Sequence, residues 1–132
     1  MPRYEAKVEI EQWVSSRKQE GKNVRFESLS IYDVNGKKTN VHFASPRPDG
    51  TFWFSVGLTY LESIDYFVWI CGQAEDYYVI PRKKMKELAV GWFSPKSERS
   101  HFRIDSKNHE YITVKKTCIS EFYRNKEAFS NQ

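Results

Sequence analysis

The sequence predicts an α+β or three-layer α/β fold in which a mixed β-sheet is flanked by helices. Apolar residues recur at helical spacing near the N-terminus, several short strands with turn signals follow, and a helix, a strand and a further helix complete the order. With 132 residues, 39% of them hydrophobic, the chain is long enough for one hydrophobic core and too apolar for a disordered segment. We therefore expect a single domain over residues 1–132.

The N-terminal part predicts a helix followed by a β-hairpin. Residues 3–20 have the apolar spacing of an amphipathic helix, and Gly21 is a stop signal. Residues 24–34 and 37–45 predict two strands, because the Asn35-Gly36 pair between them is the strongest short hairpin signal.

The middle of the chain predicts three more strands and a helix. A strand over 51–57 follows a Pro-Arg-Pro-Asp-Gly turn and continues the meander. The continuously apolar stretch 64–71 is typical of a strand covered on both faces, and 76–80 is its expected hairpin partner. Pro81 then opens a helix over 81–90, whose inward residues are Met85, Leu88 and Ala89.

The last third is more polar. Residues 91–109 predict irregular structure with a short strand at 101–104, and 110–116 predict a final strand. A C-terminal helix is expected from the spacing of Ile119, Phe122, Tyr123 and Phe129.

The hairpin turn also predicts a register. A two-residue loop pairs Val34 with Lys37 and places Leu29 opposite His42. Because side chains alternate, one face of the hairpin then carries Leu29, Ile31, Asp33, Lys38, Asn40, His42 and Ala44. The opposite face, with Tyr32, Val34, Val41 and Phe43, is the better candidate for the core.

Location and redox state follow from composition. No run of about 18 apolar residues is present, and the acidic N-terminal stretch lacks the apolar centre of a signal peptide, so we expect a cytoplasmic protein without a membrane span. Cys71 and Cys118 have no metal-binding spacing, which favours reduced core thiols.

The net charge is concentrated in one segment. The chain carries +4 overall, and residues 81–87 hold four basic residues against one acidic residue. Cations in the first turn of a helix oppose its dipole, so folding gives no reason to place them there, whereas a phosphate ligand does. The alternative is an ordinary solvated face. The predicted phosphate contacts are Arg82, Lys83, Lys84 and Lys86, with Arg47 from the proline-flanked turn.

A resemblance accompanies these patterns. The stretches VHFASPRPDGTFWFSV and IDYFVWICGQAEDYYVIPRKKM, after the N-terminal helix and the hairpin, resemble the PD-(D/E)XK (restriction-endonuclease-like) proteins. The resemblance covers residues 5–90 and implies a restriction-endonuclease-like core that acts on DNA. Such nucleases hold Mg²⁺ with an Asp and a Glu or Gln, and a Lys orients the attacking water.

The implied active-site positions depart from that pattern. The Glu/Gln-x-Lys position is His42-Phe43-Ala44 here, and Leu29 stands where the metal-binding Asp is expected. Asp33 is the nearest acid on that face, while Glu27 and Glu11 could serve only in another register. His42 itself has three open interpretations: a partly buried structural histidine, a nucleic-acid contact, or a metal ligand or general base.

Three functional hypotheses remain. The first is a DNA-binding module that has lost phosphodiesterase activity and needs no cofactor, for which reversing Lys83 and Lys84 to Glu weakens binding to all sequences. The second is an active Mg²⁺-dependent endonuclease, if Ala44 replaces a native Lys or the register differs. The third is a protein-interaction subunit of a larger DNA-processing complex or of a homo-oligomer.

The remaining aromatic and histidine residues are mostly expected to be structural. His101 and His109 are interpreted as surface-loop residues, since no Cys or carboxylate spacing makes a zinc site of them. Six aromatic residues are mostly core by alternation, and one or two of them are candidates for stacking on unpaired bases. They are Phe52, Trp53, Phe54, Trp69, Tyr77 and Tyr78.

Overall fold

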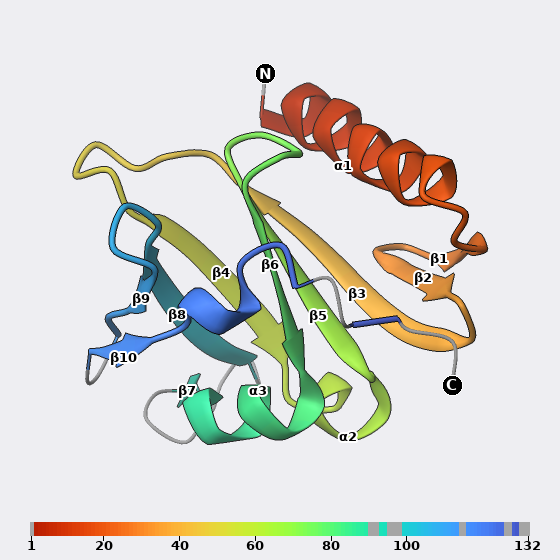
Figure 1. Cartoon of the computed structure of the whole chain (residues 1–132). Coiled ribbons are helices and arrows are strands. Elements are labelled where there is room, and N and C mark those ends of the chain that lie inside the picture. The colour runs from red at the N-terminus through yellow and green to blue at the C-terminus, as the bar shows by residue number, and fades with distance from the viewer. Residues whose placement is uncertain (1, 90–92, 95–98, 114–115, 126–127, 130–132) are drawn as a thin grey trace.

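The computed structural model describes residues 2–89, 93–94, 99–113, 116–125 and 128–129 (Figure 1). Its strands form two five-stranded sheets, so the fold is of the predicted mixed α+β class. The elements in chain order are α1 (Pro2–Gln19), β1 (Val24–Ser28), β2 (Ile31–Val34), β3 (Lys37–Ala44), β4 (Phe52–Gly57), α2 (Tyr60–Ser63), β5 (Tyr66–Cys71), β6 (Tyr77–Pro81), α3 (Arg82–Ala89), β7 (Phe93–Ser94), β8 (Arg99–Asp105), β9 (Glu110–Tyr111), β10 (Thr117–Cys118) and a 3₁₀ turn (Ser120–Phe122).

The first sheet has the order β1-β2-β3-β5-β6, and the parallel β3–β5 pair makes it mixed. The second sheet is antiparallel, in the order β10-β9-β8-β4, with β7 also paired to β8. One core fills the space between the two sheets and α3, where Phe54 stacks on Trp69 at 5.1 Å between ring centroids. A second core lies between the first sheet, α1 and the C-terminal segment, around Trp13 and Phe129.

The β2–β3 hairpin follows its turn signal. Asn35 and Gly36 both have positive φ, and the Gly36 N–H donates to the Asp33 carboxylate at 2.8 Å. The pairs run from Val34–Lys37 to Ile31–Asn40, as predicted. Val34 and Val41 are buried in the core under α1, as predicted, but Ile31 and Ala44 of the opposite face also pack in a core, the one between the two sheets.

The predicted strand 24–34 is wrong because the chain reverses within it. Leu29 adopts φ +48°, and β1 folds back along β2 so that Ser28 pairs with Ile31. Leu29 is therefore 85% exposed in a turn instead of lying opposite His42. His42 instead pairs in register with Trp69 of β5.

The strands at 66–71 and 77–81 confirm the predicted apolar hairpin, since β5 is buried at nearly every position. β4 also forms where predicted, but it leaves the meander and pairs with β8 in the second sheet. In α3, Met85 and Leu88 are buried as expected.

The structure differs more from the predictions in the C-terminal third of the chain. β8 spans seven residues where a short strand at 101–104 was expected, and the predicted strand over 110–116 contracts to Glu110–Tyr111, with 114–115 outside the described residues. The predicted C-terminal helix is wrong: the described residues after β10 contain a 3₁₀ turn and no α-helix, although Ile119, Phe122 and Phe129 are buried. Cys71 is a buried free thiol as predicted, whereas Cys118 is exposed.

Candidate nucleic-acid interface

His42 lies on the face of β3 that is turned toward the second sheet. Asn40 and His42 pair in register with Phe67 and Trp69 of β5. Because Phe67 and Trp69 both belong to the core between the sheets, Asn40 and His42 lie on the same face. The pKa of His42 is lowered to about 4, chiefly by burial and to a smaller extent by the nearby positive charge of Arg99. His42 is therefore neutral at pH 7 and contributes no charge to a phosphate site.

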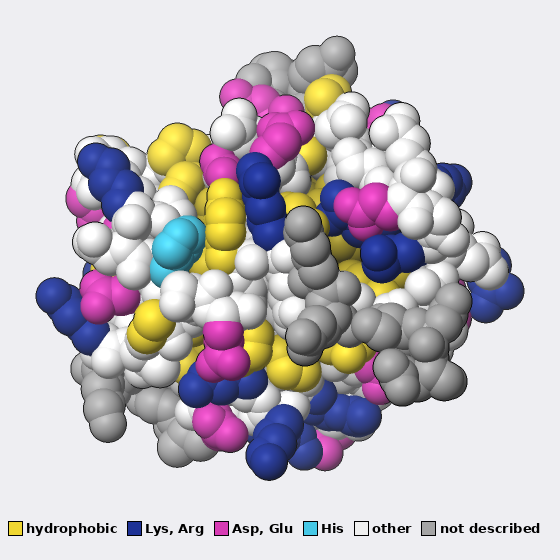
Figure 2. Space-filling view, viewed as in Figure 1, with side chains coloured by type: hydrophobic (Ala, Val, Ile, Leu, Met, Phe, Trp, Pro, Cys, Tyr) yellow, Lys and Arg dark blue, Asp and Glu magenta, His cyan; other side chains and the backbone are white. Residues whose placement is uncertain are grey.

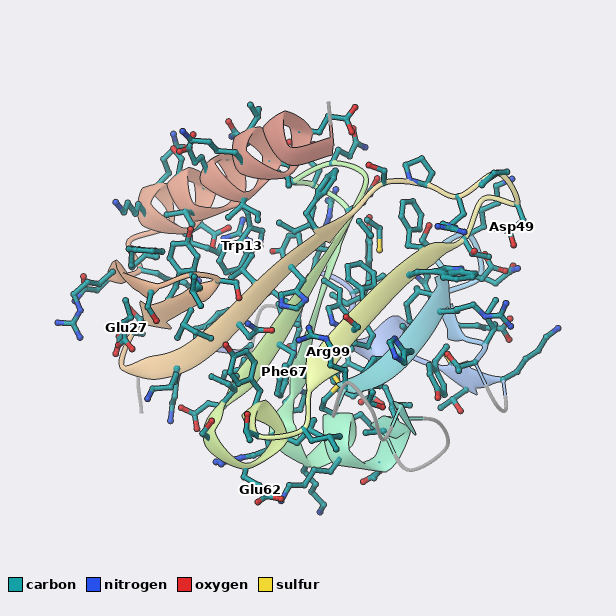
Figure 3. The ribbon with its side chains drawn as sticks, turned by 180° about the vertical axis from the view of Figure 1, so that it is seen from behind. Trp13, Glu27, Asp49, Glu62, Phe67 and Arg99 are labelled. Carbon is teal, nitrogen blue, oxygen red and sulfur yellow. The ribbon has the colours of Figure 1, made fainter. Side chains whose placement is uncertain are left out.

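The predicted metal-binding residues do not come together. Asp33 accepts the turn N–H of Gly36 and lies 3.7 Å from the Arg25 guanidinium. Ala44 packs against the core between the sheets, and Glu27 lies at the outer end of the first sheet, away from Arg99 (Figure 3). Among the described residues, no three His, Cys, Asp or Glu side chains are grouped to hold a metal ion.

Glu11 lies on the opposite side of the first sheet from His42. It raises the pKa of Tyr32, after the larger effect of burial, and Tyr32 packs against the core under α1. Neither Glu11 nor Glu27 is therefore grouped with His42, although the strand register at Leu29 differs from the expected one.

The basic residues of α3, called here the α3 cluster, are Arg82, Lys83, Lys84 and Lys86. Arg82 contacts the Asp65 carboxylate at 3.3 Å, Lys84 contacts Glu87 at 3.5 Å and Lys86 contacts Glu62 at 2.9 Å. Figure 2 shows basic and acidic side chains interleaved along this lower edge of the molecule. Four cations thus face three acids, so the cluster is a weaker phosphate site than the sequence suggested.

A second basic surface lies on the side of β4 and β8 that faces away from the first sheet. The strand register pairs Trp53 with Arg103 and Ser55 with His101, while Gly57 pairs with Arg99. Paired residues point to the same side of a sheet, and their Cβ atoms lie about 5 Å apart. The β4–β8 face therefore comprises Trp53, Ser55, Gly57, Arg99, His101 and Arg103.

Two arginine guanidinium groups contact the ring of Trp53. The Arg47 guanidinium carbon lies 4.1 Å from the Trp53 ring centroid, and that of Arg103 lies 5.7 Å from it. The Trp53 indole N–H donates to the Thr51 hydroxyl at 3.1 Å, which fixes the ring. Within the described part of the chain, neither Arg47 nor Arg103 has a carboxylate within 4.0 Å. The Arg103 Nε is buried and has no hydrogen-bond partner there either.

Arg99 extends this surface toward His42. Its Nε donates to the Ser55 hydroxyl at 3.0 Å, and its Nη2 donates to the Ser55 carbonyl at 3.1 Å. Figure 3 shows Arg99 between β3 and β4. Because Gly57 has no side chain, the Arg99 guanidinium can pass over it, and a Cβ there would lie 3.9 Å from Nη1.

Acidic residues mark the limits of the positive surface. Asp49 lies at the tip of the loop before β4, where hydrogen bonds from Thr51 and then the charge of Arg103 lower its pKa. Asp105 is at the far end of β8, paired with Glu110. The positive part of the face is thus the stretch from Arg47 through Arg103 to Arg99.

The histidines differ from expectation. His101 lies in β8 on the β4–β8 face, so its assignment to a surface loop is wrong. His109 does lie in a loop, but its Nδ1 is hydrogen-bonded to the fully buried Tyr78 hydroxyl at 2.6 Å. The expectation that the six aromatic residues are core holds for five of them, and Trp53 is the exception at 44% exposure.

Sequence reasoning placed Arg47 at the interface but missed Arg99 and Arg103. A signal was available for Arg103: residues 101–105 alternate between charged or polar and apolar side chains, a pattern typical of a strand with one solvent face.

Comparisons of the chain with protein-family models, with curated proteins and with solved structures give no match. No helix among the described residues is long and apolar enough to span a bilayer.

Proposed function

We propose that this chain is a nucleic-acid-binding domain that contacts DNA through Arg47 and the β4–β8 face and does not hydrolyse it. The observation that carries the proposal is the pair of guanidinium groups, from Arg47 and Arg103, on an exposed tryptophan. Arginines without carboxylate partners attract phosphates, and an exposed aromatic ring offers a stacking surface for bases. The α3 cluster is a secondary contact in this proposal, chiefly through Lys83.

The absence of hydrolysis is part of the same proposal. Phosphodiester cleavage of the endonuclease type needs carboxylates that hold a divalent cation near a lysine. His42 is neutral, Ala44 has no functional group, and Asp33 is used in the hairpin turn. We propose that the fold descends from an endonuclease-like core, on the resemblance of residues 5–90 and the helix–hairpin–strand order. The exposed free thiol of Cys118 accords with a cytoplasmic location, where thiols stay reduced.

Salt-dependent binding tests the interface. Fluorescence anisotropy with a labelled oligonucleotide is measured for the wild type and for the double variant Arg47→Gln/Arg103→Gln at several salt concentrations. Loss of two phosphate contacts should reduce the slope of log K against log salt by about 1.8 for duplex DNA or about 1.4 for a single strand. Lys83→Gln/Lys84→Gln is the matched control, since it removes the same charge from the α3 cluster.

We expect the control to change the slope by less than half as much, because Lys84 is already paired with Glu87. Equal effects of both double variants would contradict the assignment to the β4–β8 face, and no binding even at low salt would contradict nucleic-acid binding itself. Supercoiled plasmid incubated with Mn²⁺ or with EDTA tests hydrolysis. Metal-dependent nicking would contradict the proposed loss of activity and restore the endonuclease hypothesis.

A further inference from the structure

We infer that the depression on the β4–β8 face binds an unpaired nucleobase, so that the preferred ligand is a single strand. This inference rests on the proposed function and specifies its ligand. The depression has a volume of about 410 Å³ and is lined by Trp53, Phe54, Ser55, His101, Phe102 and Arg103. That volume lies within the range of about 300–1,000 Å³ found for small-molecule sites.

The wall of the depression has an aromatic side that folding does not explain. Trp13 and Trp69 are fully buried, whereas 44% of Trp53 is exposed on an otherwise polar strand face. Its neighbours Phe52 and Phe54 point inward and are buried, as the alternation of β4 requires. An exposed ring at this position is suited to stacking against a ligand ring.

The polar side of the depression has unused hydrogen-bond donors. The Ser55 hydroxyl oxygen accepts a hydrogen bond from Arg99, and within the described residues its own O–H has no acceptor. The Arg103 guanidinium contacts the Trp53 ring without a carboxylate partner in that part of the chain. A base stacked on Trp53 would present carbonyl oxygens and ring nitrogens, the acceptors that these two donors require.

The surrounding charges favour a phosphate-linked ligand. Arg47 lies against the same ring, and Arg99 is four residues along β8 from Arg103, about 13 Å at 3.3 Å per residue. Cations thus flank the base site along the strand direction, where the phosphates of an extended strand would pass. An acidic peptide would satisfy the arginines but supplies no flat ring with acceptors at its edge.

Whether a base is paired determines whether it can enter the depression. In a duplex each base is stacked on both faces by its neighbours, so its face is closed to Trp53. An unpaired base has a free face and free Watson–Crick edge atoms. The depression should therefore discriminate against duplex of the same sequence, although the flanking arginines attract both.

The test compares a labelled mixed-sequence 15-mer with its duplex by anisotropy, and follows tryptophan fluorescence in the same titration. We expect the single strand to bind at least fivefold more tightly at equal salt and to quench the fluorescence. Trp53→Ala should weaken single-strand binding about tenfold and duplex binding less than twofold, while Trp53→Phe keeps most of the affinity and loses most of the quenching. Phe26→Ala is the matched control, because Phe26 is an aromatic residue that is 59% exposed on β1, outside this face.

The outcomes separate the two proposals. If single strand and duplex bind equally and Trp53→Ala affects both alike or neither, the domain still binds nucleic acid but the base site is refuted. If neither ligand binds at low salt, the proposed function fails as well. If Trp53→Ala does not fold, the wild-type preference and the Trp53→Phe quenching decide the question alone.

Discussion

The most quantitative prediction concerns His42 and the pH dependence of folding. Its pKa is about 4 in the folded chain, below the ordinary histidine value of 6.5 that applies when the chain is unfolded. Between these values the unfolded state binds the proton more strongly, so stability falls as the pH is lowered through this range. At pH 7.5 and above the imidazole is almost entirely neutral in both states and has almost no effect on stability.

The magnitude follows from the two pKa values. Proton linkage gives a loss of about 2 kcal/mol at pH 5 and about 3 kcal/mol at pH 4, relative to pH 7.5. The wild-type curve combines contributions from every ionisable group of the chain, so the contribution of His42 needs a variant for comparison. The variant His42→Gln keeps a polar side chain of similar size and removes the titration.

Urea unfolding of both proteins at pH 7.5, 5 and 4 measures the difference. We expect the free energy of unfolding of the wild type to fall by about 2 kcal/mol more than that of His42→Gln between pH 7.5 and pH 5. Parallel pH curves for the two proteins would refute the conclusion that burial beside Arg99 keeps His42 neutral. That result would reopen a role for His42 as a cationic contact to phosphate.

Two further substitutions test the fold. Leu29→Gly should raise the free energy of unfolding by about 1 kcal/mol in urea titrations, because Leu29 is exposed and has φ +48°. Glu27→Gly in β1, where φ is not positive, is the control and should lower the free energy of unfolding. A lower free energy of unfolding for both variants would contradict the backbone strain at Leu29. Asp65→Ala should lower it by about 1 kcal/mol, because the Asp65 carboxylate accepts the Lys38 N–H at 2.9 Å and contacts Arg82. Lys86→Ala, which breaks only the exposed pair with Glu62, should cost less than about 0.5 kcal/mol, and equal losses would show that Asp65 acts as an ordinary surface charge.

The β2–β3 hairpin shows which part of the strand register the local sequence predicts. Asn-Gly determines a two-residue turn, and the register follows from it as far as the Ile31–Asn40 pair. The next turn, at Leu29, contains no Gly, Pro or Asn to mark it. Its positive φ is stabilised by the pairing of β1 with β2, which is a tertiary gain that overrides local preference. The predicted contact between Leu29 and His42 failed for this reason.

Local sequence patterns did not predict the second sheet. β4 has the alternation of a strand, but alternation does not say which strand is its partner. Its partner β8 follows only after α2, β5, β6, α3 and β7, and five of the seven β8 side chains are polar or charged. The C-terminal residues Ile119 and Phe122 are spaced as in a helix, yet they fill the core between the sheets from a 3₁₀ turn. Their apolar character predicted burial correctly and the secondary structure wrongly.

The two basic surfaces differ in how well folding accounts for them. In the α3 cluster each cation except Lys83 contacts an acid, and Asp65 also joins β3 to α3, so these charges are explained by the tertiary structure. On the β4–β8 face the requirement of folding is only that outward residues be polar. An exposed Trp53 between two arginines does not follow from that requirement, since a threonine and two lysines would satisfy it as well. Arginine rather than lysine is the residue that both stacks on an aromatic ring and binds phosphate through a planar fork. The residues that folding leaves unexplained are therefore those that recognition of a base and its flanking phosphates requires.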